Sequence, residues 1–251
     1  MTACSSLPTE ENKSANADEL YATAKSALQD GSYENAVKAF EKLQSRFPYG
    51  RYAQQAQLEI AYAYYKQGEP APALATLDRF VKQYPNNERL DYVLYLKGLI
   101  NFDENLNSFL STLFGQDPAE RDPGALHAAS DAFGELVSRY PDSRYAEDAR
   151  LRRQYLQVTL AKHEIAVASY YLRRRAHVAA INRAQGVLVD YPNTAQTRDA
   201  LQIMVQGYAA LGLDDLRLDT QRVLELNVAK DGIRPSRTNF QESETPWWKF
   251  W

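Results

Sequence analysis

Apolar residues recur every three or four positions along most of the chain, and the stretch from Arg51 to Pro85 shows the pattern most clearly. Two apolar stripes run along its first half: one contains Ala56 and Ile60, and the other contains Leu58 and Tyr62. This spacing predicts an amphipathic helix, because residues three and four apart lie on the same side of a helix. Two stripes on one helix predict two packing neighbours.

The second half of the same stretch predicts a partner helix. Gly68 interrupts the periodicity, and Pro70 suits the first turn of a new helix. A single apolar stripe then runs to Tyr84, and Pro85 ends it. The stretch as a whole therefore predicts a helical hairpin.

Similar hairpins are expected elsewhere, because an aromatic residue followed by proline ends four amphipathic segments. These pairs are Phe47-Pro48, Tyr84-Pro85, Tyr140-Pro141 and Tyr191-Pro192. Small and large residues also fall at the offsets of the 34-residue tetratricopeptide repeat, where small residues let two helices approach and large residues fill the adjacent groove. In the first two units these residues are Ala24, Ala36, Phe40, Ala61, Ala73, Leu77 and Phe80. We therefore expect an all-α fold, a right-handed tetratricopeptide-repeat α-solenoid of about five helical hairpins.

The third and fourth units depart from the template. In the third, the first helix is expected to end near Phe102 and the second to begin near Gly124, with an insertion over 103–123 between them. Such an insertion predicts either a structural plug or a partner-binding feature. In the fourth, Asp142 or Ser143 is expected to cap a first helix of roughly 28 residues.

These patterns divide the chain into four segments. Residues 1–17 are expected to form a lipid-anchored, flexible tether, 18–141 repeats 1–3, 142–227 repeats 4–5, and 228–251 a flexible tail. The tail ends in PWWKFW, whose four aromatic side chains are poorly suited to full solvation. Docking at a membrane interface, on a partner protein or back on the repeats would each suit tryptophan, so all three remain open.

Charge and hydropathy argue against a nucleic-acid partner and against a membrane-spanning helix. The chain has 29 basic and 32 acidic residues, a net charge of -3, which provides no electrostatic footprint for nucleic acid. No apolar run approaches the roughly 18 to 20 residues that a membrane-spanning helix needs.

The lone cysteine, Cys4, excludes an internal disulfide and a cysteine-based zinc cluster. Thr2-Ala3-Cys4, followed by the small residues Ser5 and Ser6, resembles the end of a bacterial lipoprotein signal. In such proteins the cysteine is acylated and the polar segment after it is a tether. The alternative is an ordinary N-terminal segment that happens to contain a thiol.

No pattern of catalytic or metal-ligating residues is present in the sequence. The three histidines, His127, His163 and His177, lie on different expected helices without ligand spacing, and no nucleotide-binding or nucleophile motif occurs. We therefore expect no catalytic residues, no metal site and no cofactor, and a binding role for the concave surface of the array.

Tyrosines provide the strongest candidates for that role. Tyr62, Tyr64 and Tyr65 lie on the first helix of a repeat, and first helices line the inner groove of a tetratricopeptide array. A tyrosine at such a position serves either packing or ligand contact. Because the three cannot all face the same side, we expect at least one to face the groove.

Five motifs follow one another along the chain: IAYAYYK at 60–66, LDRFVKQYP at 77–85, DYVLYLKGL at 91–99, RDP at 121–123 and YPNTAQTRDAL at 191–201. In this set and order they resemble the BamD family, outer-membrane lipoproteins of the β-barrel assembly machinery in Gram-negative bacteria. The resemblance covers nearly all of Cys4 to Asn227, and it implies five tetratricopeptide repeats in two halves. The PWWKFW tail departs from it and receives no family role.

The resemblance implies a non-enzymatic scaffold on the periplasmic face of the outer membrane, anchored by an acylated Cys4. Its partners would be the periplasmic domains of the barrel insertase subunit, other lipoproteins of the complex and unfolded outer-membrane proteins. The resemblance assigns Tyr62 and Tyr65 to the substrate signal, and Arg198 and Asp199 to insertase docking. The alternative is a soluble peptide-binding tetratricopeptide adaptor or chaperone that is not tied to a membrane.

Overall fold

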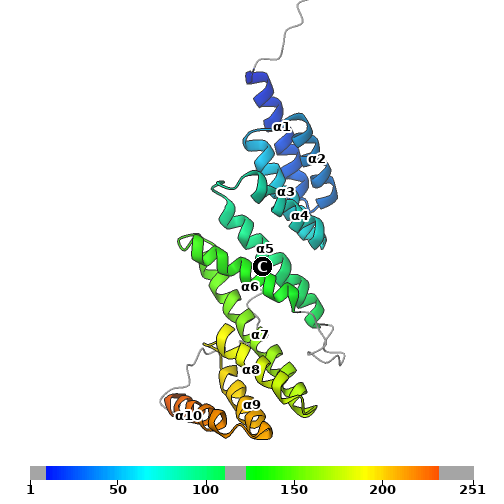
Figure 1. Cartoon of the computed structure of the whole chain (residues 1–251). Coiled ribbons are helices and arrows are strands. Elements are labelled where there is room, and N and C mark those ends of the chain that lie inside the picture. The colour runs from blue at the N-terminus through cyan, green and yellow to red at the C-terminus, as the bar shows by residue number, and fades with distance from the viewer. Residues whose placement is uncertain (1–9, 111–122, 232–251) are drawn as a thin grey trace, which may run out of the picture. The chain divides into compact units, whose positions relative to one another are not determined.

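The computed structural model describes residues 10–110 and 123–231, and every regular element in these two ranges is an α-helix (Figure 1). The helices are α1 Glu10–Gln29, α2 Tyr33–Arg46, α3 Arg51–Gln67, α4 Pro70–Gln83, α5 Leu90–Leu110, α6 Gly124–Arg139, α7 Ala146–Arg173, α8 His177–Asp190, α9 Gln196–Leu211 and α10 Asp214–Asp231. None of these helices is long and apolar enough to cross a membrane. The all-α, tetratricopeptide-type fold expected from the sequence is confirmed.

The chain forms two compact units, which divide within α7 between Leu156 and Gln157. In the described part of the first unit, each helix from α1 to α5 packs against the next one along the chain, and the start of α7 belongs to the same unit. In the second unit, α8 packs against α9 and α9 against α10. Each unit is thus a run of helical hairpins.

Helix α3 has two packing neighbours, as its two apolar stripes predict. Ala56 and Ile60 are buried in a core shared with α1 and α2, whereas Leu58 is buried in a core shared with α4 and α5. Phe40 and Phe80 are fully buried in these two cores. The large residues at the template positions therefore fill the spaces between neighbouring hairpins.

The four aromatic-proline stops share one backbone conformation. The aromatic residues Phe47, Tyr84, Tyr140 and Tyr191 all have φ near -130° and ψ between 48° and 72°, and each backbone N–H donates to the carbonyl four residues earlier. The following proline explains this conformation, because its ring excludes the helical region for the residue before it. Each helix therefore closes its last hydrogen bond and stops.

Glycine is required where the backbone turns in the left-handed region. Gly68 ends α3 with φ 74° and ψ 28°, and Gly212 ends α9 with φ 69° and ψ 23°. A side chain with a Cβ is disfavoured in this region by sterics. The interruption at Gly68 seen in the sequence is thus the turn of a hairpin.

Two other glycines allow helices to approach closely. A Cβ at Gly98 of α5 would overlap the ring of Phe133 on α6, and a Cβ at Gly207 of α9 would lie 2.6 Å from Cγ1 of Ile181 on α8. Gly98 follows Ala61 by 37 residues, and Ala61 follows Ala24 by 37 residues, so all three occupy the same position of successive repeats. Ala24 and Ala61 are fully buried there.

Three boundaries differ from those expected: the start of α1, the end of α5, and the end of α10, which continues to Asp231 into the segment 228–251 assigned to a flexible tail. Helix α1 begins at Glu10, inside the segment 1–17 assigned to a tether, and Ala17 is already buried. Helix α5 does not end near Phe102 but continues to Leu110, so the first part of the expected insertion is helical. Cys4, residues 111–122 and the PWWKFW tail lie outside the described residues.

Neither Asp142 nor Ser143, the two predicted caps of α7, stands at the residue directly before the helix. The helix begins at Ala146, three residues after Ser143. The Ser143 hydroxyl accepts the N–H of Tyr145 at 3.2 Å and donates to Asp91 of α5 at 2.6 Å. Ser143 therefore supports the turn before α7 and connects it to α5.

Candidate functional site

The first unit contains a groove of about 600 Å³ whose lining comes from three helices and two connections. Helices α1, α3 and α5, the residue before α5 and the turn between α6 and α7 all contribute to it. The lining residues are Lys25, Leu28, Leu58, Glu59, Tyr62, Arg89, Asp91, Tyr92, Arg144 and Tyr145. Apolar, aromatic and charged groups therefore face the same space.

Tyrosine rings form a large part of the groove wall. Tyr62, on α3, is half-buried, and the rings of Tyr92 and Tyr145 lie 5.8 Å apart between centroids. Tyr145 also stacks on Tyr95 at 4.7 Å, which fixes the orientation of its ring. Burial, followed by the negative charge of Glu59, raises the pKa of Tyr92 well above its ordinary value, so its hydroxyl stays neutral.

Positively charged side chains come from separate elements around the groove. Lys25 of α1 pairs with Glu59 of α3 at 2.6 Å, and Tyr21 donates to the same carboxylate at 3.2 Å. Arg144 is exposed, and its guanidinium carbon lies 4.7 Å from the centroid of the Tyr145 ring. The lining thus places three cations beside two carboxylates, those of Glu59 and Asp91.

Arg89 is held by the turn that precedes α5. Its backbone N–H donates to the side-chain oxygen of Asn87 at 2.9 Å. The Asn87 amide in turn donates to Gln54 of α3 at 2.9 Å. Local asparagine bonding of this kind fixes a turn without a helical or sheet partner. The α4–α5 connection therefore presents an exposed arginine at the groove.

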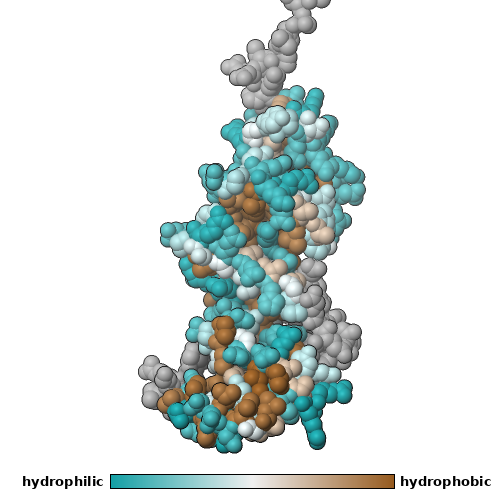
Figure 2. Space-filling view, viewed as in Figure 1, coloured by the Kyte–Doolittle hydropathy of each residue, from teal (hydrophilic) through white to brown (hydrophobic). Residues whose placement is uncertain are grey.

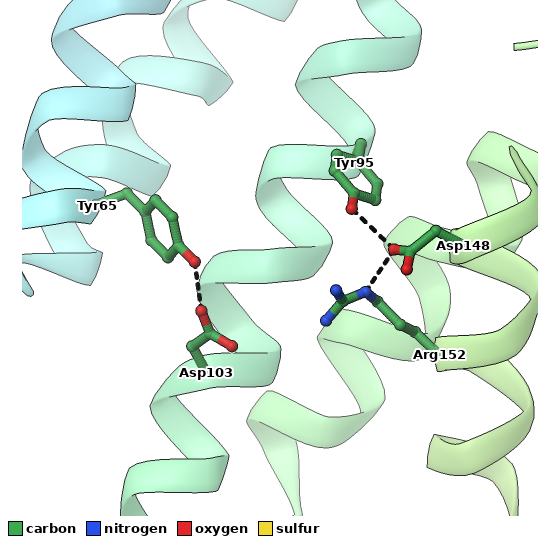
Figure 3. Close-up of polar contacts among 5 residues, drawn as sticks. All are labelled: Tyr65, Tyr95, Asp103, Asp148 and Arg152. Carbon is green, nitrogen blue, oxygen red and sulfur yellow. Dashed lines mark hydrogen bonds and ion pairs between the residues drawn. The ribbon is translucent and has the colours of Figure 1, made fainter. Parts of the chain in front are cut away.

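Tyr65 has different surroundings from Tyr62, although their ring centroids are only 6.3 Å apart. Figure 3 shows Tyr65 pointing from α3 to Asp103 of α5, and its hydroxyl donates a short hydrogen bond to that carboxylate. Burial and this hydrogen bond raise the pKa of Tyr65 above its ordinary value. Tyr62 therefore lines the groove, whereas Tyr65 connects two helices beside it.

A second tyrosine–carboxylate contact connects α5 to α7. The Tyr95 hydroxyl donates to Asp148 at 2.8 Å, and Asp148 also accepts from the guanidinium of Arg152 (Figure 3). Arg152 is buried, and its guanidinium lies 5.2 Å from the centroid of the Phe102 ring. Burial, followed by the hydrogen bond to Asp148, raises the pKa of Tyr95 to about 12. This network positions the stacked Tyr145 ring through Tyr95.

Arg198 and Asp199 belong to the second unit and stand in the first turn of α9. Arg198 is half-buried, and Asp199 is exposed. Their side chains leave the helix in directions about 100° apart, because successive residues of a helix are rotated by this amount. In the part of the chain that the structure describes, no cluster of three or more histidine, cysteine or acidic side chains could hold a metal ion.

Sequence reasoning identified Tyr62 but missed most of its neighbours in the groove. Arg89, Arg144 and Tyr145 lie in connections between helices, where no apolar period marks them. Tyr92 lies in the motif DYVLYLKGL, which carries the family resemblance but no pattern of a binding site. The only sequence signal for these residues is that each is an aromatic or basic residue near a hairpin connection.

Consecutive helical hairpins, proline stops after aromatic residues and buried small residues at helix contacts define a tetratricopeptide-type repeat protein with a peptide-sized groove. A family described as "Outer membrane lipoprotein" (YfiO) matches residues 13–224. The chain belongs to this family, whose curated relatives carry the name BamD.

Curated relatives match nearly the whole chain. A protein of Neisseria meningitidis serogroup A named "Outer membrane protein assembly factor BamD" is 45% identical over 93% of this chain and 86% of its own length. A protein of Vibrio cholerae with the same name is 43% identical over 83% of this chain and 86% of its own length. Among solved structures, "Crystal structure of MamA protein" is 16% identical with a TM-score of 0.40, over 88% of this chain and 95% of that one.

Proposed function

We propose that the chain is a non-enzymatic scaffold of the complex that assembles β-barrel proteins in the outer membrane. Membership of an outer-membrane lipoprotein family and relatives named as assembly factors support this role. They do not favour a soluble adaptor that is unrelated to membranes. Acylation of Cys4 would hold the chain at the periplasmic face of the outer membrane.

The groove of the first unit is the proposed receiving site for unfolded outer-membrane proteins. The observation that carries this proposal is that Tyr62, Tyr92 and Tyr145 share one groove with the cations Lys25, Arg89 and Arg144. Barrel strands alternate apolar and polar residues and carry aromatic residues near the membrane interfaces. An extended aromatic strand ending in a carboxylate would stack its rings on the tyrosines and pair its charge with the arginines.

Peptide binding tests this site. A fluorescent peptide that carries the last strand of an outer-membrane barrel should bind Tyr62→Ala about tenfold more weakly than the unchanged chain, as anisotropy would measure, because a central aromatic contact is lost. Tyr49→Ala is the control, since Tyr49 is 89% exposed and is not among the groove residues. Equal affinity of the Tyr62→Ala variant and the unchanged chain would remove Tyr62 from the receiving site. Tyr65 is proposed to act indirectly, by holding α5 and α3 together beside Tyr62.

Arg198 and Asp199 are proposed to dock the periplasmic domains of the barrel insertase subunit, and other lipoproteins of the complex to bind the same scaffold. Arg198→Glu should reduce co-purification of the insertase by about tenfold or more, because charge reversal at an interface replaces attraction by repulsion. Arg174→Glu, an exposed arginine of the same unit, is the charge-matched control. Full recovery with Arg198→Glu would exclude this docking role.

A further inference from the structure

The last described helix of the second unit, α10, exposes several large apolar side chains. On α10, Leu216 is 48% exposed, Val223 46% and Leu226 58%. The second helices α2, α4 and α6 carry no large hydrophobic side chain that is exposed. On α8, the second helix of the fourth hairpin, Val178 and Val189 are exposed near the two ends of the helix. A helix at the end of a repeat array usually carries a polar outer face, so an apolar face on the last described helix indicates that another segment covers it.

The exposed apolar residues of α10 lie along one side of the helix. Leu216, Val223 and Leu226 are separated by seven and three residues, which places them on neighbouring positions of one face. Leu213, in the turn before α10, is 43% exposed and extends this face toward α9. Figure 2 shows hydrophobic surface gathered over the part of the molecule that Figure 1 labels α9 and α10. We call Leu213, Leu216, Val223 and Leu226 the α10 face.

The chain itself supplies a segment that fits this face. Residues 232–251 follow α10 directly and lie outside the described residues. They end in Pro246-Trp247-Trp248-Lys249-Phe250-Trp251, which offers four aromatic side chains within six positions. An aromatic side chain buries roughly 150 to 250 Å² when it docks, more than any other type. The family match ends at residue 224, so family membership gives this segment no role.

Chain length permits the contact. Helix α10 has 18 residues and is therefore about 27 Å long. The fifteen residues 232–246 can span up to about 50 Å when extended, enough to return along the whole helix. A short tether of this kind holds the segment at an effective concentration in the millimolar range. Even weak aromatic contacts would therefore keep it docked.

Charge also favours docking of the PWWKFW segment on α10. Between residues 214 and 227, α10 carries four acidic side chains and two basic ones, Arg217 and Arg222. Lys249 stands in the middle of the aromatic run and would face this acidic surface. We propose that the PWWKFW segment docks intramolecularly on the α10 face and caps the second unit, covering the apolar surface that a further repeat would otherwise bury.

Tryptophan fluorescence tests the proposal directly, because the three tryptophans of the chain, Trp247, Trp248 and Trp251, all lie in this segment. In the full chain in detergent-free buffer, their emission should be shifted to shorter wavelength than that of a free PWWKFW peptide and protected from acrylamide. Leu216→Asp should abolish both the shift and the protection, because it places a charge in the α10 face.

Leu218→Asp is the matched control, since Leu218 is 50% exposed on the same helix but two positions away, on the opposite side. Protection lost in Leu216→Asp and kept in Leu218→Asp supports the proposal. The proposal is overturned if the unchanged chain and both variants show the same emission as the free peptide. Protection that requires phosphatidylethanolamine–phosphatidylglycerol vesicles overturns it in favour of membrane docking, and protection that rises with protein concentration overturns it in favour of a second copy.

Discussion

At the level of single residues, two tyrosine hydroxyls of the first unit donate hydrogen bonds to carboxylates on a neighbouring helix and so connect the helices. Tyr65 donates to Asp103 between α3 and α5, and Tyr95 donates to Asp148 between α5 and α7. A half-buried phenol that donates to a carboxylate resists ionisation, because its anion would face a like charge without full solvation. These contacts therefore require neutral tyrosines, and they hold the helices around Tyr62.

A pH dependence follows from Tyr95. Its pKa is about 12 in the folded chain, against an ordinary value of 10.0, so the folded state binds more protons than the unfolded state between pH 10 and 12. Its contribution to stability is complete below pH 10 and is lost as pH rises through 12. The free energy of unfolding should fall less steeply in this window for Tyr95→Phe than for the unchanged chain, as urea unfolding at several pH values would measure.

Tyr49→Phe is the control for that experiment, since the Tyr49 side chain is almost fully exposed. It should leave the slope between pH 10 and 12 unchanged. The account of the Tyr95 contact is wrong if Tyr95→Phe and the unchanged chain lose stability in parallel over this range.

At the level of helices, the closest contact between α5 and α6 depends on the missing side chain of Gly98. Gly98→Ala would force a methyl group into the fully buried ring of Phe133. Overpacking costs about 1 to 3 kcal/mol, more than the roughly 1 kcal/mol that alanine gains over glycine in helix propensity. The free energy of unfolding should therefore fall, as urea unfolding followed by circular dichroism would show.

Gly186 offers a matched comparison on α8. A Cβ at this position meets nothing within 4 Å, and the residue lies inside a helix. Gly186→Ala should therefore stabilise the chain by up to about 1 kcal/mol. If both alanine variants stabilise, the α5–α6 contact is not limited by Gly98.

The helices and their stops could be predicted from the sequence, because each depends on local rules. The two stripes of α3, the turn at Gly68 and the conformation of Tyr84 before Pro85 follow from periodicity, glycine and proline alone. The continuation of α5 to Leu110 was missed because its polar residues, DEN at 103–105, resemble a loop. Helix continuation there depends on context rather than on an apolar period.

The groove was harder to predict than the helices that form it. Tyr62 could be proposed from its place on a first helix, but Arg89 and Arg144 are 55 residues apart and line one groove only because the hairpins stack. The packing roles of Gly98 and Gly207 were equally hard to predict, because each depends on contact with a neighbouring helix. Contacts between repeats therefore carry information that a single amphipathic pattern does not contain.

At the level of the whole molecule, the two units offer two candidate binding surfaces with different chemistry. The first unit provides an aromatic and basic groove, and the second provides Arg198 and Asp199 at the start of α9 together with the apolar α10 face. A scaffold needs separate surfaces for a client and for a machine component. This division supports the proposal that the first unit receives substrates and the second docks the insertase, with the boundary inside α7 and not at residue 142.

Site-specific cross-linking in living cells tests the central claim most directly. A photoreactive phenylalanine analogue at position 62 should cross-link newly made outer-membrane proteins during their assembly, because the Tyr62 side chain lines the groove. The same analogue at position 49, where the side chain is almost fully exposed, should give little product. Cross-links to outer-membrane proteins at 62 but not at 49 would support the account. No cross-link at 62, in cells that assemble these proteins normally, would contradict it.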